Sequence, residues 1–197
     1  MVLRKFYISG LFFFLLLIDG VFAQDGKGKT LFPHHIKAQF AGGIGLASIA
    51  AGYSNKNETI EGDIFYGYVP ESAGGVKIHA LTAKMTSFII KPVVLKKVQV
   101  RPLSLGFFIS YTFGKQYFGF TPENYPYDYY GLPTSLHSAV FIGGQIQRQF
   151  SKGKSVGLYY ELISFDREII SFVNNTRSLD ITDILNIALG LKYSFKR

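Results

Sequence analysis

The sequence contains no cysteine and, after its first 23 residues, no long hydrophobic run. Without cysteine the chain cannot form disulfides or carry the lipid-modified cysteine of a lipoprotein. A membrane-spanning helix needs ~18 consecutive apolar residues, and no segment after Ala23 supplies them. Charged residues are also few, at 17%, whereas 48% of the residues are hydrophobic and 16% are aromatic. Alternating strands reconcile these observations, because apolar residues at every second position never form a run.

Positive charge exceeds negative charge, and the formal net charge is +8. The lysines are scattered, however, and form neither a basic stripe nor a recognised nucleic-acid-binding motif. We therefore expect no nucleic-acid partner. Two explanations of the charge stay open, namely attraction to anionic lipid head groups and ordinary solubilising charge at turns.

Residues 1–23 have the three parts of a secretory signal peptide: a basic start, the apolar stretch Leu11–Ile18, and a small-residue exit that ends at Ala23. The apolar stretch is too short for an uncleaved membrane anchor, and an acidic residue follows it. We therefore predict cleavage after Ala23. Residues 24–35 are then predicted to form a periplasmic N-terminal segment, and residues 36–197 the folded domain.

The final segment, residues 185–195, alternates between two kinds of side chain. One face carries Leu185, Ile187, Leu189, Leu191, Tyr193 and Phe195. The other carries Asn186, Ala188, Gly190, Lys192 and Ser194. An apolar face opposite a small and polar face is typical of a strand with lipid on one side and a crowded polar lumen on the other.

Similar alternation predicts strands at 60–68, 103–113, 136–150 and 156–162, and 76–90 forms a further strand of ambiguous phase. The stretch Ile36–Tyr53 contains three glycines that can form a tight turn, and its apolar phase shifts there. We divide it into two strands, because bacterial single-chain barrels have even strand counts. The predicted fold is all-β, an eight-stranded antiparallel transmembrane β-barrel with up-and-down meander topology.

The predicted connections differ in length between the two ends of the barrel. Residues 55–58, 91–97 and 151–154 form short polar turns at one end. The segments 70–75, 115–134 and 165–182 are mostly longer and lie at the other end with the glycine turn. Short periplasmic turns and longer external loops are the outer-membrane pattern. Within the last loop, residues 165–175 form either a short amphipathic helix on the barrel rim or a continuation of the strand.

The predicted inward face carries a few charges of both signs among small residues. These are Lys37, Glu61, Asp63, Lys84, Glu161 and Lys192. They predict a filled, mutually neutralised lumen without an open pore, because side chains fill an eight-stranded barrel. The alternative fold is a soluble barrel such as a lipocalin, which would turn its apolar face inward around a ligand cavity.

The end of the chain resembles the assembly signal of outer-membrane barrels. Gly190 is followed by Tyr193 and Phe195 at alternate positions, although Lys196 and Arg197 extend past the usual terminal aromatic residue. This resemblance implies recognition by the barrel-assembly machinery. It also implies a location in the outer membrane of a Gram-negative bacterium.

The order of elements in most of the mature chain is similar to that of the eight-stranded lipid A 3-O-deacylase family, with Ser155-Val156-Gly157-Leu158 opening the penultimate strand. In that family this strand carries a lipid-facing His-x-Ser pair, in which the histidine is the base and the serine the nucleophile. The corresponding residues here are Leu162-Ile163-Ser164. Leucine cannot accept the proton of a serine hydroxyl. Ser164 is therefore a candidate nucleophile without a base, and we assign no catalytic residue.

The loop 115–134 is rich in aromatic residues, and its candidate ligand-binding residues are Tyr125, Tyr127, Tyr129 and Tyr130. Such rings favour an interfacial girdle in the lipid head-group layer together with packing within the loop, and they also suit stacking on lipopolysaccharide sugars. Outer-membrane lipid and lipopolysaccharide are thus the expected partners.

The histidines do not predict a site. His34-His35 lacks further spaced ligands, so we predict no metal site, and nothing in the sequence calls for a cofactor. His137 and Ser138 are strand neighbours that point to opposite faces and cannot form a catalytic pair. We therefore expect a barrel of structural or surface-interaction type without catalysis. The alternative is a lipid A-modifying, deacylase-like enzyme that uses other residues.

Overall fold

The computed structural model describes residues 32–114, 117, 134–150, 153–176 and 178–195. The predicted signal peptide at 1–23 lies outside these residues, as do Tyr125, Tyr127, Tyr129 and Tyr130.

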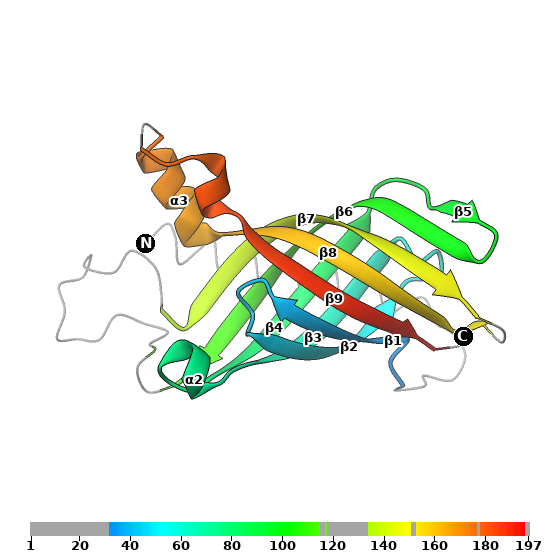
Figure 1. The fold of residues 1–197 in the computed structure, drawn as a ribbon, viewed down its shortest axis with the longest axis horizontal. Helices are drawn as coiled ribbons and strands as arrows, with labels where there is room; N and C mark the ends of the chain where they lie inside the picture. Colours follow the sequence, from blue (N-terminus) through cyan, green and yellow to red (C-terminus); the bar gives the residue numbers. More distant parts are fainter. Residues whose placement is uncertain (1–31, 115–116, 118–133, 151–152, 177, 196–197) are drawn as a thin grey trace.

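Eight antiparallel strands form a closed barrel, as the sequence predicts (Figure 1). They are β1 (His35–Ala41), β2 (Ala47–Ser54), β3 (Ile60–Val69), β4 (Ile78–Phe88), β6 (Val98–Phe113), β7 (Leu136–Gln149), β8 (Ser155–Phe165) and β9 (Asn186–Ser194). Each strand pairs with its neighbour along the chain, and β9 returns to pair with β1. The barrel is therefore an up-and-down meander without an open edge between its first and last strands.

One predicted turn contains a strand. Residues 91–97 were expected to be a short polar turn, but β5 (Val93–Leu95) pairs with the first residues of β6. The prediction was wrong because three consecutive apolar residues there match the start of β6 in register. Leu95 lies opposite Val98, which leaves Lys96 and Lys97 as a two-residue hairpin turn.

The glycine-rich segment between β1 and β2 forms the predicted tight turn. Gly42, Gly43 and Gly45 all have positive φ angles, which glycine adopts without steric cost. The turn bends inward, so Ile44 is only 1% exposed. Gly67 makes this possible, because a Cβ atom at Gly67 would lie 1.6 Å from the Ile44 carbonyl oxygen.

Three short helices lie at one end of the barrel, which we call the long-loop end (Figure 1). They are α2 (Glu71–Gly74), α3 (Asp166–Asn174) and the 3₁₀ helix η2 (Ile181–Ile184). The opposite end, which we call the short-turn end, carries β5 and the end of β9. None of the helices in the described part of the chain is long and apolar enough to cross a membrane.

Helix α3 decides between the two structures left open for residues 165–175. Two side chains fix its first turn to the barrel. The backbone N–H and the hydroxyl of Ser138 in β7 both donate to Asp166, each at 3.0 Å. The amide of Asn186 in β9 donates to Glu168 at 2.8 Å. The helix is therefore attached to strands on either side of β8.

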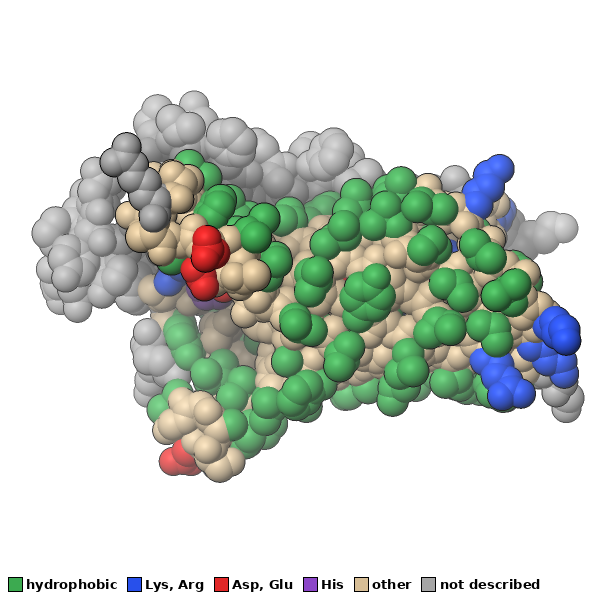
Figure 2. Space-filling model, turned by 45° about the horizontal axis from the view of Figure 1, so that its top comes forward, with side chains coloured by type: hydrophobic (Ala, Val, Ile, Leu, Met, Phe, Trp, Pro, Cys, Tyr) green, Lys and Arg blue, Asp and Glu red, His purple; other side chains and the backbone are tan. Residues whose placement is uncertain are grey.

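The outer face of the barrel is apolar on every strand. Exposed examples, one from each barrel strand, are Ile36, Ile49, Ile64, Leu81, Leu105, Ile142, Leu158 and Leu189. Figure 2 shows hydrophobic side chains spread over one face of the barrel wall, with most of the visible Lys and Arg at the short-turn end. The predicted inward charges are all buried. This polarity is the reverse of that expected for a lipocalin-like soluble barrel.

Candidate functional site

The lumen is the most chemically distinctive part of the molecule, and its first feature is a buried cluster of charges near the short-turn end. β1 and β3 lie on either side of β2, and their inward side chains meet in the lumen. The Lys37 ammonium lies 2.7 Å from Asp63 and 2.9 Å from Glu61. His35 Nε2 donates to Asp63 at 2.7 Å, and Lys192 from β9 pairs with Glu61. Each buried carboxylate thus faces cationic or donor groups, which offsets part of its desolvation cost.

A second ion pair lies deeper in the barrel. Lys84 of β4 donates to Glu161 of β8, which faces it across the lumen, and to Gln39 at 3.3 Å. The same ammonium lies 4.5 Å from the ring centre of Phe141 and 5.1 Å from that of Phe65. These distances suit cation–π attraction. Lys84 therefore joins the charged residues to the aromatic residues beyond them.

We call the residues of these two groups the charged half of the lumen. They are His35, Lys37, Glu61, Asp63, Lys84, Glu161 and Lys192. The predicted mutual neutralisation is confirmed, because each of the six predicted charged side chains forms an ion pair with a side chain of opposite charge.

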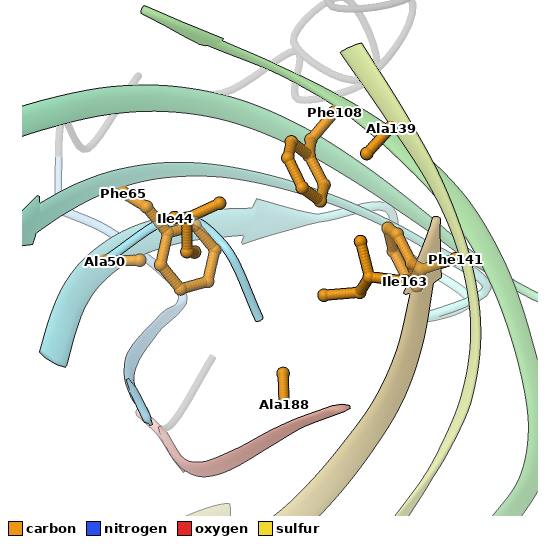
Figure 3. Close-up of a cluster of buried hydrophobic side chains, with 8 residues drawn as sticks. All are labelled: Ile44, Ala50, Phe65, Phe108, Ala139, Phe141, Ile163 and Ala188. Carbon is orange, nitrogen blue, oxygen red and sulfur yellow. The ribbon is translucent and has the colours of Figure 1, made fainter. Parts of the chain in front are cut away.

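The other half of the lumen, towards the long-loop end, is apolar. We call it the apolar half, and its buried residues are Ile44, Ala50, Phe65, Phe108, Ala139, Phe141, Ile163 and Ala188. Figure 3 shows these side chains converging on the barrel interior from different strands, with Ile44 supplied by the glycine turn. Phe165 packs against the same group. These eight side chains carry no polar atoms, and the buried Thr82 hydroxyl, opposite Phe65, is already bonded to Ser110 at 2.8 Å.

The mouth at the short-turn end is lined by polar side chains that bond to one another. Arg101 bonds to Glu58 at 2.8 Å and stacks 4.4 Å from the ring centre of Phe88. Gln145 donates to Gln147 at 2.7 Å, and Gln147 donates in turn to Gln99. The lumen therefore presents three levels in sequence: polar amides and Arg101, the charged half, and the apolar half.

His35, Glu61 and Asp63 place one potential metal-ligand atom each within 4.8 Å of one another. The Lys37 ammonium already lies within 3 Å of both carboxylates, at 2.9 and 2.7 Å. A divalent cation would have to displace this ammonium or share the carboxylates with it. The geometry therefore favours an ion-pair cluster over a metal site.

Ser164, the candidate nucleophile, faces outward, opposite Val140 of β7. Its side chain is buried, and its Oγ has no hydrogen-bond partner. Leu162 shares its face of β8 by strand alternation, and Asp166, the first residue of α3, already accepts two hydrogen bonds from Ser138. The hydroxyl thus lacks the contact to a base that activates a serine.

The other histidines take structural positions. His137 contacts the carbonyl of Thr134 at 3.0 Å, whereas Ser138 bonds to Asp166 on the opposite face, so the two are not a catalytic pair. The imidazole of His79 lies 2.6 Å from the Tyr66 hydroxyl on the outer face.

Of the residues that resemble an assembly signal, Gly190 and Tyr193 lie on opposite faces of β9, and Phe195 follows the strand. Gly190 faces inward beneath Tyr159, and a Cβ atom there would lie 2.2 Å from the Tyr159 ring. Tyr193 and Phe195 pack edge to face, with ring centres 5.2 Å apart. The packing of Tyr159 therefore explains why position 190 is a glycine, independently of recognition by an assembly machinery.

Sequence reasoning missed His35 and Tyr159 as members of the lumen network. His35 is the first residue of β1, and it shares the inward phase of Lys37 and Gln39. Extending that phase by two residues would have found it. Tyr159 hydrogen-bonds to Gln39 at 3.1 Å. Its alternation with the outward-facing Leu158 and Tyr160 likewise predicts that it faces inward.

No protein-family model matches the chain. No curated protein matches it either. The resemblance to the lipid A 3-O-deacylase family thus has only the residues of this chain to support it.

Proposed function

We propose that the chain is an outer-membrane β-barrel protein of a Gram-negative bacterium, with a structural or surface-interaction role and without catalysis. One observation carries this proposal: all eight strands expose large apolar side chains, while the charged residues of the strands are buried inside, except Arg148 at the short-turn end of β7. Water disfavours an apolar surface of this extent, whereas hydrocarbon suits it. Strands β3, β4, β8 and β9 have 9 to 11 residues, which matches the ~9–11 residues of a tilted membrane-spanning strand.

The long-loop end supports the surface-interaction part of the proposal. Helix α3 is held to β7 and β9 by its first turn, yet it leaves Ile169, Ile170 and Val173 exposed. A fixed helix with an exposed apolar face suits contact with lipid or another surface molecule. Tyr125, Tyr127, Tyr129 and Tyr130 stay a prediction for contact with lipopolysaccharide sugars.

Fractionation of a Gram-negative host that expresses the full chain tests the proposal. We expect the processed protein in outer-membrane fractions, and we expect folded and heat-denatured samples to migrate differently in detergent gels. Because side chains occupy both halves of the lumen, we also expect little or no conductance in planar bilayers. Recovery of folded protein in the soluble periplasmic fraction would overturn the proposal.

The competing function is a lipid A-modifying enzyme that uses Ser164. We expect Ser164→Ala to leave the lipid A mass spectrum of expressing cells unchanged, and wild-type expression to leave it unchanged relative to an empty vector. The physical reason is the missing base beside the hydroxyl. A deacylated species that appears with the wild type and disappears with Ser164→Ala would contradict the non-enzymatic proposal.

A further inference from the structure

The two ends of the barrel carry opposite charge. Among the described residues, the short-turn end exposes six basic side chains: Lys56, Lys91, Lys96, Lys97, Arg148 and Lys154. Its one exposed acid, Glu58, is paired with Arg101. The long-loop end carries five acids and two bases: Glu71, Asp166, Glu168, Asp180 and Asp183, with Lys77 and Arg167. In Figure 2 most of the blue side chains on the visible face lie at the short-turn end, whereas the red ones lie at the other end.

These six basic groups, which we call the basic rim, are available for an external partner. None of them forms an ion pair with another described residue, whereas the lysines inside the lumen are all paired. Several unpaired cations around one end of a barrel create a field that attracts anions. The charge asymmetry therefore points to an anionic partner at this end and not at the other.

The hairpin of β5 combines this charge with exposed apolar surface. Val93, Val94 and Leu95 are 51%, 59% and 62% exposed, and Lys91, Lys96 and Lys97 flank them. Apolar residues bordered by lysines are typical of segments that lie at the boundary between head groups and acyl chains. A partner with both an anionic group and a hydrocarbon region fits this combination.

The turn of this hairpin supports a role for its charge. Lys96 has a φ of 56°, a conformation that glycine and asparagine adopt more readily than lysine. Lys96 thus occupies a turn position in which glycine or asparagine would fit the backbone better.

We propose that the basic rim and the β5 hairpin bind acidic phospholipid head groups in the membrane leaflet at the short-turn end. This inference rests on the proposed function, because it requires the barrel to span a membrane. The phosphates would contact the lysines, while Val93, Val94 and Leu95 would lie among the upper acyl chains. A basic residue near an anionic lipid surface contributes about fivefold in affinity.

The test compares insertion with lipid preference. The urea-denatured mature chain is refolded into vesicles of phosphatidylcholine alone, or of equal parts phosphatidylcholine and phosphatidylglycerol. The inserted protein is then extracted in mild detergent, and its bound lipids are counted by native mass spectrometry at low and high salt. We expect the wild type to insert into both vesicles and to retain phosphatidylglycerol preferentially at low salt.

Two sets of variants make the test specific. Lys91→Gln, Lys96→Asn and Lys97→Gln together remove three charges of the basic rim, and Lys96→Asn also suits the turn, so folding is retained. We expect the preference for phosphatidylglycerol to fall about tenfold or more. The matched control, Lys77→Gln with Arg167→Gln, removes the two bases of the long-loop end that lie among the described residues, and it is expected to leave the preference unchanged.

The outcomes separate this inference from the proposed function. Failure of the wild type to insert into either vesicle would overturn the proposed function and this inference with it. Insertion without preference for phosphatidylglycerol would overturn only the inference. An equal loss of phosphatidylglycerol preference in both sets of variants would also overturn the inference. The same holds if the three lysines retain added lipopolysaccharide more strongly than phosphatidylglycerol.

Discussion

Near the short-turn end the lumen is filled by ion pairs, whereas towards the long-loop end it is filled by aromatic and aliphatic side chains. In the charged half every carboxylate depends on a partner from another strand, such as Glu61 on Lys192. In the apolar half, Phe108 and Ile163 depend only on the shape and volume of their neighbours. The difference teaches that a barrel interior can be filled in one part by ion pairs and in another by close packing of apolar side chains. The two halves should therefore fail in different ways.

The largest effect is expected from breaking the pair at the boundary of the two halves. Lys84→Met leaves Glu161 buried without its cation, which is expected to lower the free energy of unfolding by about 3–5 kcal/mol. Lys84→Met with Glu161→Met removes both charges and is expected to recover most of the loss. Urea unfolding of the inserted barrel measures both. Equal stability of the single variant and the wild type would mean that pairing does not hold the charged half.

A somewhat smaller effect is expected in the apolar half. Ile163→Ala removes buried volume beside the glycine turn and is expected to cost about 3 kcal/mol. Ile142→Ala, on the outer face of β7, is the control and is expected to cost less, because no interior cavity forms. The same urea titration compares them. A loss at Ile142 equal to that at Ile163 would contradict packing as the source of stability in this half.

The inward position of the glycine turn can be changed from β3. Gly67→Ala places a methyl group against the Ile44 carbonyl, so we expect the turn to move out of the lumen at a cost of about 1–3 kcal/mol. Planar-bilayer recordings are expected to show increased conductance. Gly62→Ala is the matched control on the same strand, since a Cβ atom at Gly62 has no neighbour within 4 Å. Equal conductance of the two variants would contradict a sealing role for Ile44.

The smallest effect is expected at a polar side chain of β4 that lacks a partner. The Thr86 hydroxyl is buried without a hydrogen bond, so Thr86→Val is expected to leave stability unchanged or to raise it by up to about 1 kcal/mol. Thr82→Val is the matched control, because the Thr82 hydroxyl donates to Ser110 at 2.8 Å. That change is expected to cost about 1 kcal/mol. Destabilisation by Thr86→Val would show that the interior near the charged half depends on polarity as well as on pairing.

The strands could be predicted from the sequence because their signal is local. Alternation along 185–195 predicts one outward and one inward face, and β9 has both. The glycines at 42–45 likewise predict a turn, which the structure contains. β5 was missed, because its three residues are too short for alternation and become a strand only by pairing with β6.

The candidate sites were less predictable than the strands. Alternation places Lys84 and Glu161 on the inward face, but their pairing joins residues 77 positions apart. Ser164 was assigned to the outer face correctly, yet its burial and its unbonded hydroxyl could not be predicted from the sequence. The pairing of Lys84 with Glu161 and the surroundings of Ser164 both depend on how the closed barrel curves.

The sequence by itself determined the positions of the eight barrel strands and the two faces of most of them, because alternation and turn chemistry act within a few residues. Only the tertiary structure decided how the inward residues are matched and layered. Closure between β1 and β9 brings His35, Lys37 and Lys192 to the same level as Glu61 and Asp63. The inward bend of the glycine turn adds Ile44 to the apolar half. These contacts join residues from distant parts of the chain, so no local pattern specifies them.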